Sequence, residues 1–249
     1  MESGKNPIKA IIEGDFDSRV HDLAVEGCTF THQAQIVQEW RQQGRFFVFN
    51  AGTYDILTLN HILGLVQCRA LGAMALLEIE NIKTEQDRHL VHGVAASDSI
   101  GLMVTLDTNL ALEERKSRRP EKGGAPKPTL DWSSRAIILA MQSIPAPDYK
   151  TRRSVVDYIT RHGPECCTSC EPGKCINEDN AKMALGLQPD LVVVNSQSLQ
   201  TIDDLKGYQD GGLLPNTVIR VVDESENYYM DPVLGGAVTT TSIIKRVRS

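Results

Sequence analysis

The sequence predicts an α/β fold with a doubly wound parallel sheet, and three features of the chain indicate it. Phe46–Phe49 and Ile100–Asn109 are short apolar runs, which is typical of strands that are covered on both faces. Between these runs, apolar residues recur at helical spacing over Ile62–Leu71, and Gly72 is the expected end of this helix. The segment Asn50–Asp55 interrupts the apolar pattern and indicates a tight turn from strand to helix.

The turn and the start of the following helix form the most informative site in the chain. A strand that enters a helix through a tight turn presents backbone N–H groups and the positive end of the helix dipole, which suits a phosphate group. Thr58, Asn60 and His61 lie at the expected helix start, where their side chains are able to reach such a phosphate. We therefore interpret the segment as a nucleotide site. The alternative is that His61 simply caps the helix.

Composition narrows the class of protein. The chain has 249 residues, of which 41% are hydrophobic and 23% are charged, and this is enough for one sizeable α/β domain with additions. Its net charge of −6 argues against a broad nucleic-acid-binding surface. No apolar stretch approaches the roughly 18 residues that span a bilayer, and the N-terminus has no long apolar signal segment. We expect a cytoplasmic protein with reduced cysteines and with no nucleic-acid or membrane partner.

The residues after the first strand also resemble a known family. Asn50–Gly72, NAGTYDILTLNHILGLVQCRALG, is similar to the signature of the cytidylyltransferase-like nucleotidyltransferases. That signature is a G-x-F-D segment followed by H-x-G-H or T-x-G-H, which opens a helix ending in A-x-x-L-G. The positions that match in order and spacing are Gly52, Tyr54, Asp55, Thr58, His61 and Ala70–Gly72.

Other parts of the chain extend the resemblance to most of Thr31–Ser249. Upstream, Thr31–Asn50 resembles the helix and basic turn that precede the first strand in the nucleotidyltransferase domain of ADP-heptose synthase. The glycerol-3-phosphate cytidylyltransferases are the other group of closest resemblance. The similar segments downstream are a second strand ending near Asp107, a basic stretch at Lys116, a helix carrying Arg135 (Asp131–Gln142), a later strand (Gln188–Ser196) and a terminal threonine motif (Val238–Arg248).

The resemblance implies a Rossmann-like domain over residues 31–249, with residues 1–30 as an N-terminal extension. Two segments are insertions relative to the family. Residues 78–95 read as a loop with a brief helix, while residues 152–187 begin as a helix at Ser154–His162 and continue as a cysteine-bearing loop. Lys116–Thr129 is rich in basic residues, Gly and Pro, and it reads as a mobile loop over the site.

The resemblance also implies a reaction. In this family the phosphate of an acceptor attacks the α-phosphate of a nucleoside triphosphate and pyrophosphate leaves, with Mg²⁺ held mainly by the phosphates. His61, Lys116 and Thr58 would then be catalytic, and Asp55 would order the turn or lie near the metal. The implied nucleotide-binding residues are Asn50, Ala51, Gly52, Tyr54, Asp55, Asn60, Asp107, Arg119, Arg135, Asn195, Thr239, Thr240, Thr241 and Ser242.

Several of these residues have a second interpretation. The basic stretch around Lys116 has the composition of a solvated loop, and Thr239–Ser242 that of an ordinary strand-like run before a helix cap. Asn60, Asn195–Ser196 and Ala237 stand where many relatives have glycine close to the nucleotide. Side chains at these positions point to altered nucleotide geometry or to lost activity.

The function that the sequence favours is transfer of a nucleotidyl group from a nucleoside triphosphate to a small phosphorylated sugar or polyol. A heptose-phosphate adenylyltransferase is the most similar activity, and a glycerol-phosphate-type cytidylyltransferase is the alternative within the family. A catalytically inactive nucleotide-binding regulatory or scaffold protein on the same fold is the alternative from another class. The choice between ATP and CTP stays open, as does the choice between a monomer and a homodimer.

Four cysteines lie together in the loop HGPECCTSCEPGKC, which spans His162–Cys175. The Cys-x-x-Cys spacing in a short Gly- and Pro-containing loop is compatible with a tetrahedral zinc site, and a reduced surface thiol cluster is the alternative. Such a zinc ion would be structural, because the implied phosphate-binding residues lie elsewhere in the chain. The candidate ligands are Cys166, Cys167, Cys170 and Cys175, with His162 as an alternative to Cys166.

Overall fold

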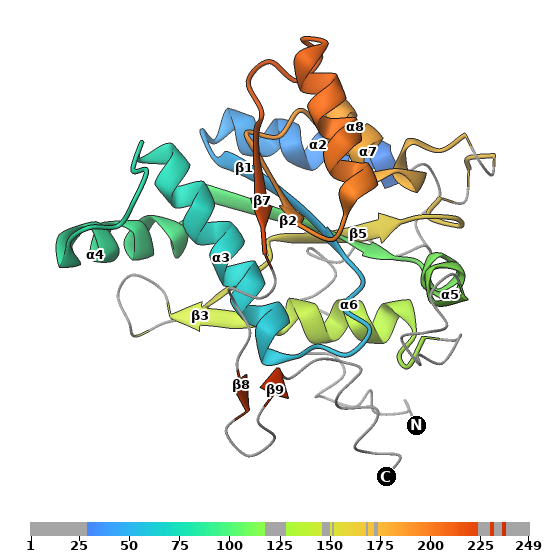
Figure 1. Ribbon diagram of the computed structural model, residues 1–249, viewed down its shortest axis with the longest axis horizontal. Coiled ribbons are helices and arrows are strands. Elements are labelled where there is room, and N and C mark those ends of the chain that lie inside the picture. Colours follow the sequence, from blue (N-terminus) through green and yellow to red (C-terminus); the bar gives the residue numbers. More distant parts are fainter. Residues whose placement is uncertain are drawn as a thin grey trace, which may run out of the picture.

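The structure is a computed structural model, and it describes residues 29–117, 128–145, 150, 152–167, 169–171, 174–223, 230–231 and 236–237. Its centre is a five-stranded sheet in which every neighbouring pair of strands is parallel (Figure 1). The strands in their order across the sheet are β5 (Tyr158–His162), β2 (Ile100–Asp107), β1 (Phe46–Gly52), β6 (Leu191–Asn195) and β7 (Val218–Val222).

This strand order is that of a Rossmann-like doubly wound sheet. From β1 the chain adds β2 and then β5 on one side, and it returns across β1 to add β6 and β7 on the other. The change of direction creates a switch point between β1 and β6, and in such sheets ligands bind at the carboxyl ends of the strands beside the switch point. The fold class predicted from the sequence is confirmed.

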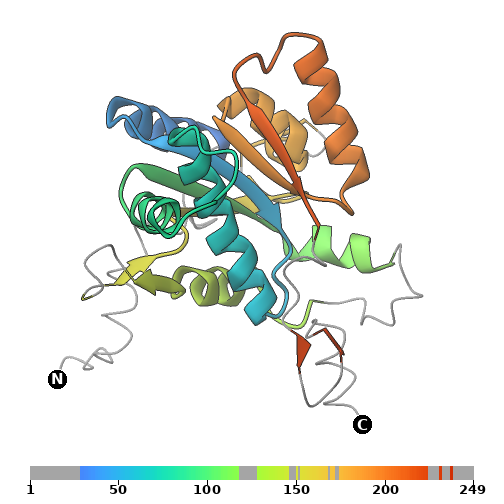
Figure 2. The same ribbon diagram turned by 60° about the vertical axis from the view of Figure 1, so that its left-hand side comes forward.

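Helices cover both faces of the sheet (Figure 2). One apolar core packs α3, α4 and α6 against one face, and a second packs α2, α7 and α8 against the other. The helices are α2 (Thr29–Gln42), α3 (Leu59–Leu76), α4 (Glu85–Ala95), α5 (Asn109–Ser117), α6 (Trp132–Ala140), the 3₁₀ helix η2 (Ile176–Glu178), α7 (Asn180–Leu187) and α8 (Leu199–Asp210). Two short antiparallel pairs complete the described elements, β3 (Ser143–Pro145) with β4 (Arg152–Ser154) and β8 (Met230–Asp231) with β9 (Gly236–Ala237).

One predicted element is wrong. Ser154–His162 was expected to begin a helix, but Tyr158–His162 is the edge strand β5, and it pairs with β2 from Met103 to Asp107. All five residues of β5 are buried, so the segment lacks the one-sided burial of a surface helix. The 152–187 segment therefore contributes a strand to the central sheet in addition to its cysteine-bearing loop.

Two helices differ in length from the sequence expectation. The brief helix expected within residues 78–95 is α4, which has 11 residues and begins at a capping box between Thr84 and Asp87. Helix α3 does not end at Gly72 but continues to Leu76. Gly72 serves close packing instead, since a Cβ there would lie 2.6 Å from Cγ2 of Val48 in β1.

Helix α3 has 18 residues and is long and apolar enough to cross a membrane by length and composition alone. This differs from the sequence-based expectation that no apolar stretch is long enough to span a bilayer. In the fold 28% of this stretch is buried, and its buried residues Leu65, Cys68, Arg69, Gly72 and Ala73 face the sheet. The buried Arg69 forms a 2.7 Å ion pair with Asp157, which ties the helix to the protein interior.

Asp157 is the centre of a charged network at the amino ends of the strands. Its carboxylate pairs with Arg69 at 2.7 Å, with Arg153 at 2.7 Å and with Arg45 at 3.1 Å. It also accepts a 2.8 Å hydrogen bond from the backbone N–H of Leu102 in β2. The network joins β1, β2, β5 and α3 at the edge of the sheet opposite to the switch-point crevice.

Candidate functional site

The candidate site begins at the turn from β1 to α3, at the carboxyl edge of the sheet. Tyr54 has a backbone φ of 45°, which is unusual for a bulky residue, and its hydroxyl donates a 2.8 Å hydrogen bond to Oδ1 of Asn50. This conformation lays the Tyr54 ring over Gly52, where a Cβ would lie 2.3 Å from the ring. A side chain at position 52 would therefore displace the Tyr54 ring from this position.

Asp55 orders the next part of the turn. Its buried carboxylate accepts hydrogen bonds from the backbone N–H groups of Thr129 and Leu130, at 2.7 and 3.3 Å, and from the Thr129 hydroxyl at 3.1 Å. These bonds fasten the turn to the segment that leads into α6. Of the two roles expected for Asp55, the geometry supports ordering of the turn.

Thr58 and His61 cap the N-terminus of α3. The Thr58 backbone N–H donates to Nδ1 of His61 at 3.1 Å, and the Thr58 hydroxyl lies 3.2 Å from the same nitrogen. Because a backbone N–H only donates, Nδ1 is the acceptor, and the proton of the neutral ring is on Nε2. The Tyr54 ring packs edge-on against the imidazole at 5.3 Å. Capping thus fixes the ring and its tautomer, and Nε2–H becomes a donor at the helix N-terminus.

Asp107 and Arg135 support the turn from the neighbouring strand and helix. Oδ2 of Asp107 accepts a 2.9 Å hydrogen bond from the Thr53 hydroxyl. The Arg135 guanidinium donates to the backbone oxygens of Thr53 and Asp107, both at 2.8 Å, and to Oδ1 of Asn109 at 2.9 Å. Burial lowers the pKa of Arg135, while the nearby Asp107 carboxylate opposes this and keeps the guanidinium charged. Both side chains hold the turn through these bonds.

His162 belongs to the same group, although the sequence suggested it only as a metal ligand. It lies at the end of β5, and its Nδ1 is 3.1 Å from Oδ1 of Asp107. Its Nε2 is buried without a hydrogen-bond partner among the described residues. No local signal points to this contact, because it depends on β5 pairing with β2.

A pocket lies at the switch point, between β1 and β6. Asn50 bridges the two strands through a 2.9 Å hydrogen bond from Nδ2 to the Val193 oxygen. The Asn195 side-chain oxygen accepts a 2.8 Å hydrogen bond from the Gln197 N–H, which stabilises the turn after β6. Asn60 is half-buried in the first turn of α3. The pocket is lined by Phe49, Ala51, Asn180, Val192, Val193, Val194, Asn195, Ser198, Thr201 and Leu205.

The fold thus brings together most of the predicted site residues. Asn50, Ala51, Gly52, Asp107 and Asn195 lie at the carboxyl ends of β1, β2 and β6, and Tyr54, Asp55, Thr58, Asn60 and His61 follow in the β1–α3 turn and the first turn of α3. Arg135 reaches the same turn from α6, and of these residues Ala51 and Asn195 line the pocket. Lys116 is in α5, but its side chain lies outside the described part of the chain. The other predicted residues outside the described part are Arg119, Thr239, Thr240, Thr241 and Ser242.

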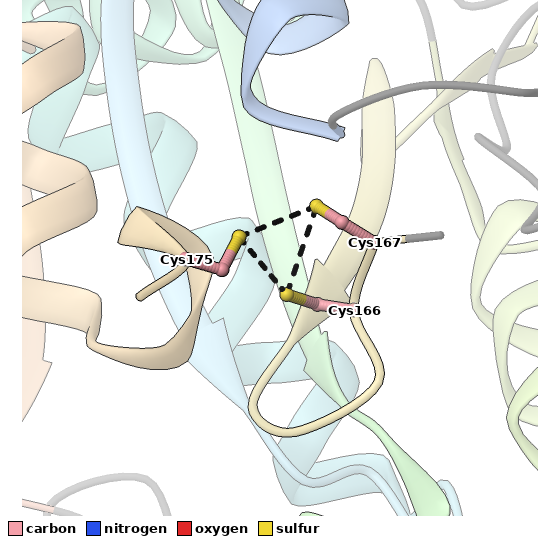
Figure 3. A group of neighbouring side chains, drawn as sticks. All are labelled: Cys166, Cys167 and Cys175. Atoms are coloured by element: carbon pink, nitrogen blue, oxygen red, sulfur yellow. Dashed lines mark hydrogen bonds between the residues drawn. The ribbon is translucent and has the colours of Figure 1, made fainter. Parts of the chain in front are cut away.

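A thiol cluster lies in the connection from β5 to α7 (Figure 3). The Sγ atom of Cys175 is 3.4 Å from that of Cys166 and 3.3 Å from that of Cys167. Cys166 and Cys167 are 3.8 Å apart, and Nδ2 of Asn177 donates to Cys167 at 3.7 Å. The hydrogen bond with Cys167, together with burial, raises the pKa of Cys166, and burial raises that of Cys175. The three sulfur atoms lie within 4.8 Å of one another and could hold a metal ion.

No family model matches the chain, and no curated protein is significantly similar to it. The likeness to the nucleotidyltransferases therefore depends on the β1–α3 motif and its supporting segments alone.

Proposed function

We propose that the protein is a nucleotidyltransferase that transfers a nucleotidyl group from a nucleoside triphosphate to a small phosphorylated sugar or polyol and releases pyrophosphate. The observation that carries the proposal is the capped start of α3 beside the switch point of the sheet. There the helix N-terminus and Nε2–H of His61 offer hydrogen-bond donors after the carboxyl end of β1. A separate pocket lies at the carboxyl ends of β1 and β6, on the face of the sheet that α7 and α8 cover.

The chemistry follows from donors that are fixed before the reaction starts. Negative charge accumulates on the transferred phosphoryl group and on the leaving pyrophosphate, and donors that are already oriented stabilise it without reorganisation. The two contacts from Thr58 to Nδ1 hold the His61 ring, so its Nε2–H is oriented in advance. Asp55, Asp107 and Arg135 keep the turn in place around it.

The remaining parts of the proposal come from the sequence. Lys116, Arg119 and the hydroxyls of Thr239–Ser242 would bind the β- and γ-phosphates, and Mg²⁺, held mainly by the phosphates, would neutralise part of their charge. Heptose-phosphate adenylyl transfer is the most similar activity, with glycerol-phosphate cytidylyl transfer as the alternative. We place the reaction in the cytoplasm. A structural Zn²⁺ at the thiol cluster is a separate proposal and takes no part in this chemistry.

A nucleotide-binding scaffold is the second candidate function. Asn60, in the first turn of α3, stands where relatives carry glycine, and a side chain there narrows the approach of a phosphate to the helix N-terminus. Asn195 gives weaker support, because its side chain is held by the Gln197 N–H.

The experiment is a panel of ATP, CTP, GTP and UTP, each with Mg²⁺, against sugar phosphates and polyol phosphates, scored by pyrophosphate release. We expect release that depends on both the triphosphate and one acceptor class. Binding of a triphosphate without release for any acceptor would favour the scaffold, and no binding of any triphosphate would contradict both functions.

A further inference from the structure

We propose that Cys166, Cys167, Cys170 and Cys175 bind one Zn²⁺ ion through four thiolates, at a site separate from the proposed phosphate chemistry. Three of the four sulfur atoms already stand in an arrangement that suits the ion (Figure 3). With Zn–S bonds of about 2.3 Å, the sulfur atoms of a tetrahedral site are about 3.8 Å apart. The observed separations are 3.3, 3.4 and 3.8 Å, so only small shifts are needed to admit the ion.

Cys170 is the fourth ligand in this assignment. Its sulfur atom is outside the group of three that lie within 4.8 Å of one another, so its side chain would have to turn toward them to complete the site. Cys170 and Cys167 make up the Cys-x-x-Cys unit that wraps one side of a tetrahedral site. His162, the other candidate from the sequence, directs Nδ1 to Asp107 and is held there at the end of β5.

The surroundings favour a thiolate-bound metal. The Asn177 amide donates to Cys167 Sγ, and amide donors of this kind stabilise the negative charge on metal-bound thiolates. Cys166 and Cys175 are buried, with 1% and 7% of their surface exposed. Buried thiols form only weak hydrogen bonds with one another. A bound metal ion would instead coordinate every sulfur atom of the cluster. Soft sulfur ligands in tetrahedral geometry select zinc over magnesium or calcium.

The ion would join two ends of a long connection. Cys166 and Cys167 follow β5, and Cys175 directly precedes η2, where the Gly163 N–H already donates to the Asn177 oxygen at 2.9 Å. The sequence placed this loop away from the phosphate-binding residues. In the fold the cysteine-bearing loop follows directly from His162, the last residue of β5, whose side chain contacts Asp107 at the carboxyl edge of the sheet. The proposed ion therefore braces the end of β5 beside the candidate site.

The first measurement is the zinc content of the full-length chain, purified under reducing conditions without a histidine tag. We expect about one zinc ion per chain, and X-ray absorption at the zinc edge should show four sulfur neighbours at about 2.3 Å. Cobalt exchanged into the site should give the intense visible bands of tetrahedral thiolate coordination. Zinc content near zero, with Cys166, Cys167, Cys170 and Cys175 all open to thiol reagents, would overturn the site. Oxygen or nitrogen neighbours in place of sulfur would also overturn it.

Substitutions then test the ligand set. Cys167→Ser and Cys170→Ser, at the two half-buried positions, should each lower zinc affinity by at least about a hundredfold, comparable to or greater than the loss of a supporting outer-shell contact. Cys68→Ala is the matched control, because Cys68 is buried in α3 and outside the cluster, and it should keep one zinc ion per chain. Unchanged affinity and four sulfur neighbours in Cys170→Ser would overturn the assignment of Cys170. The wild-type measurements remain decisive if a variant fails to fold.

Discussion

Replacing His61 with alanine is expected to lower turnover by about two orders of magnitude or more, while the lost helix cap reduces folding stability by only about 1 kcal/mol. An oriented donor to a developing phosphoryl charge contributes on this scale when it is removed. His61 is only half-buried at the start of α3, so its loss leaves no cavity in the core. Turnover should be measured by pyrophosphate release with the best donor and acceptor from the panel, and stability by urea unfolding.

The control for His61→Ala is His89→Ala. His89 lies on α4 with 67% of its side chain exposed, and its contact with Glu85 at 3.5 Å is a surface pair. This variant should keep both turnover and stability. If His61→Ala turns over like the wild type while the donor and acceptor are correct, the histidine is only a helix cap, and the scaffold function gains support.

Replacing Asp157 with asparagine is expected to destabilise the protein by about 3–5 kcal/mol, the range for breaking a buried ion pair. The substitution keeps the shape of the side chain but removes the charge that three arginines share. Arg69, whose side chain has 0% exposure, would then be buried without its carboxylate partner. Urea unfolding measures the loss. Asp203→Asn, on the exposed face of α8, removes the same charge and should change the free energy of unfolding by less than about 0.5 kcal/mol.

The same carboxylate predicts how stability depends on pH. Burial alone would raise the pKa of Asp157, but the charges of Arg69, Arg153 and Arg45 outweigh it and hold the pKa below its usual value. The stabilisation is therefore complete above the unfolded-state pKa of about 3.9, and it is lost as the pH falls through the lower folded-state value. Asp157→Asn should show a flatter loss of stability below about pH 4. An equally steep loss in the variant and the wild type would exclude Asp157 as the group responsible.

The sequence predicted the elements whose signals are local. The strands β1 and β2 are continuous apolar runs, and α3 has helical apolar spacing, whereas α2, α6 and β6 were expected from the family resemblance. The segment that contains β5 misled because VVDYITRH carries no turn signal and fits either periodicity. The segment is a strand because it pairs with β2, about 55 residues earlier in the chain. Pairing over this distance cannot be recognised from the residues of the segment alone.

The candidate site likewise has a part that could be predicted from local sequence and a part that depends on contacts between distant residues. The β1–α3 turn is contiguous, so Gly52, Asp55, Thr58 and His61 could be predicted together from one motif. The contact between Asp107 and His162 joins residues 55 positions apart, and it could not be foreseen while the second of them was assigned to a helix. The thiol cluster was predictable from spacing alone, because all of its members lie within one loop.

The most direct test of the central claim is where a triphosphate binds. The chain has six histidines, so long-range ¹⁵N–¹H spectra of their rings resolve His61, with His61→Ala giving the assignment. Titration with Mg²⁺ and each of the four nucleoside triphosphates should shift the His61 Nε2 resonance saturably for at least one of them, and the affinity should fall in His61→Ala. A triphosphate that binds equally well to the variant, with no shift at His61, would contradict a phosphate site at the start of α3.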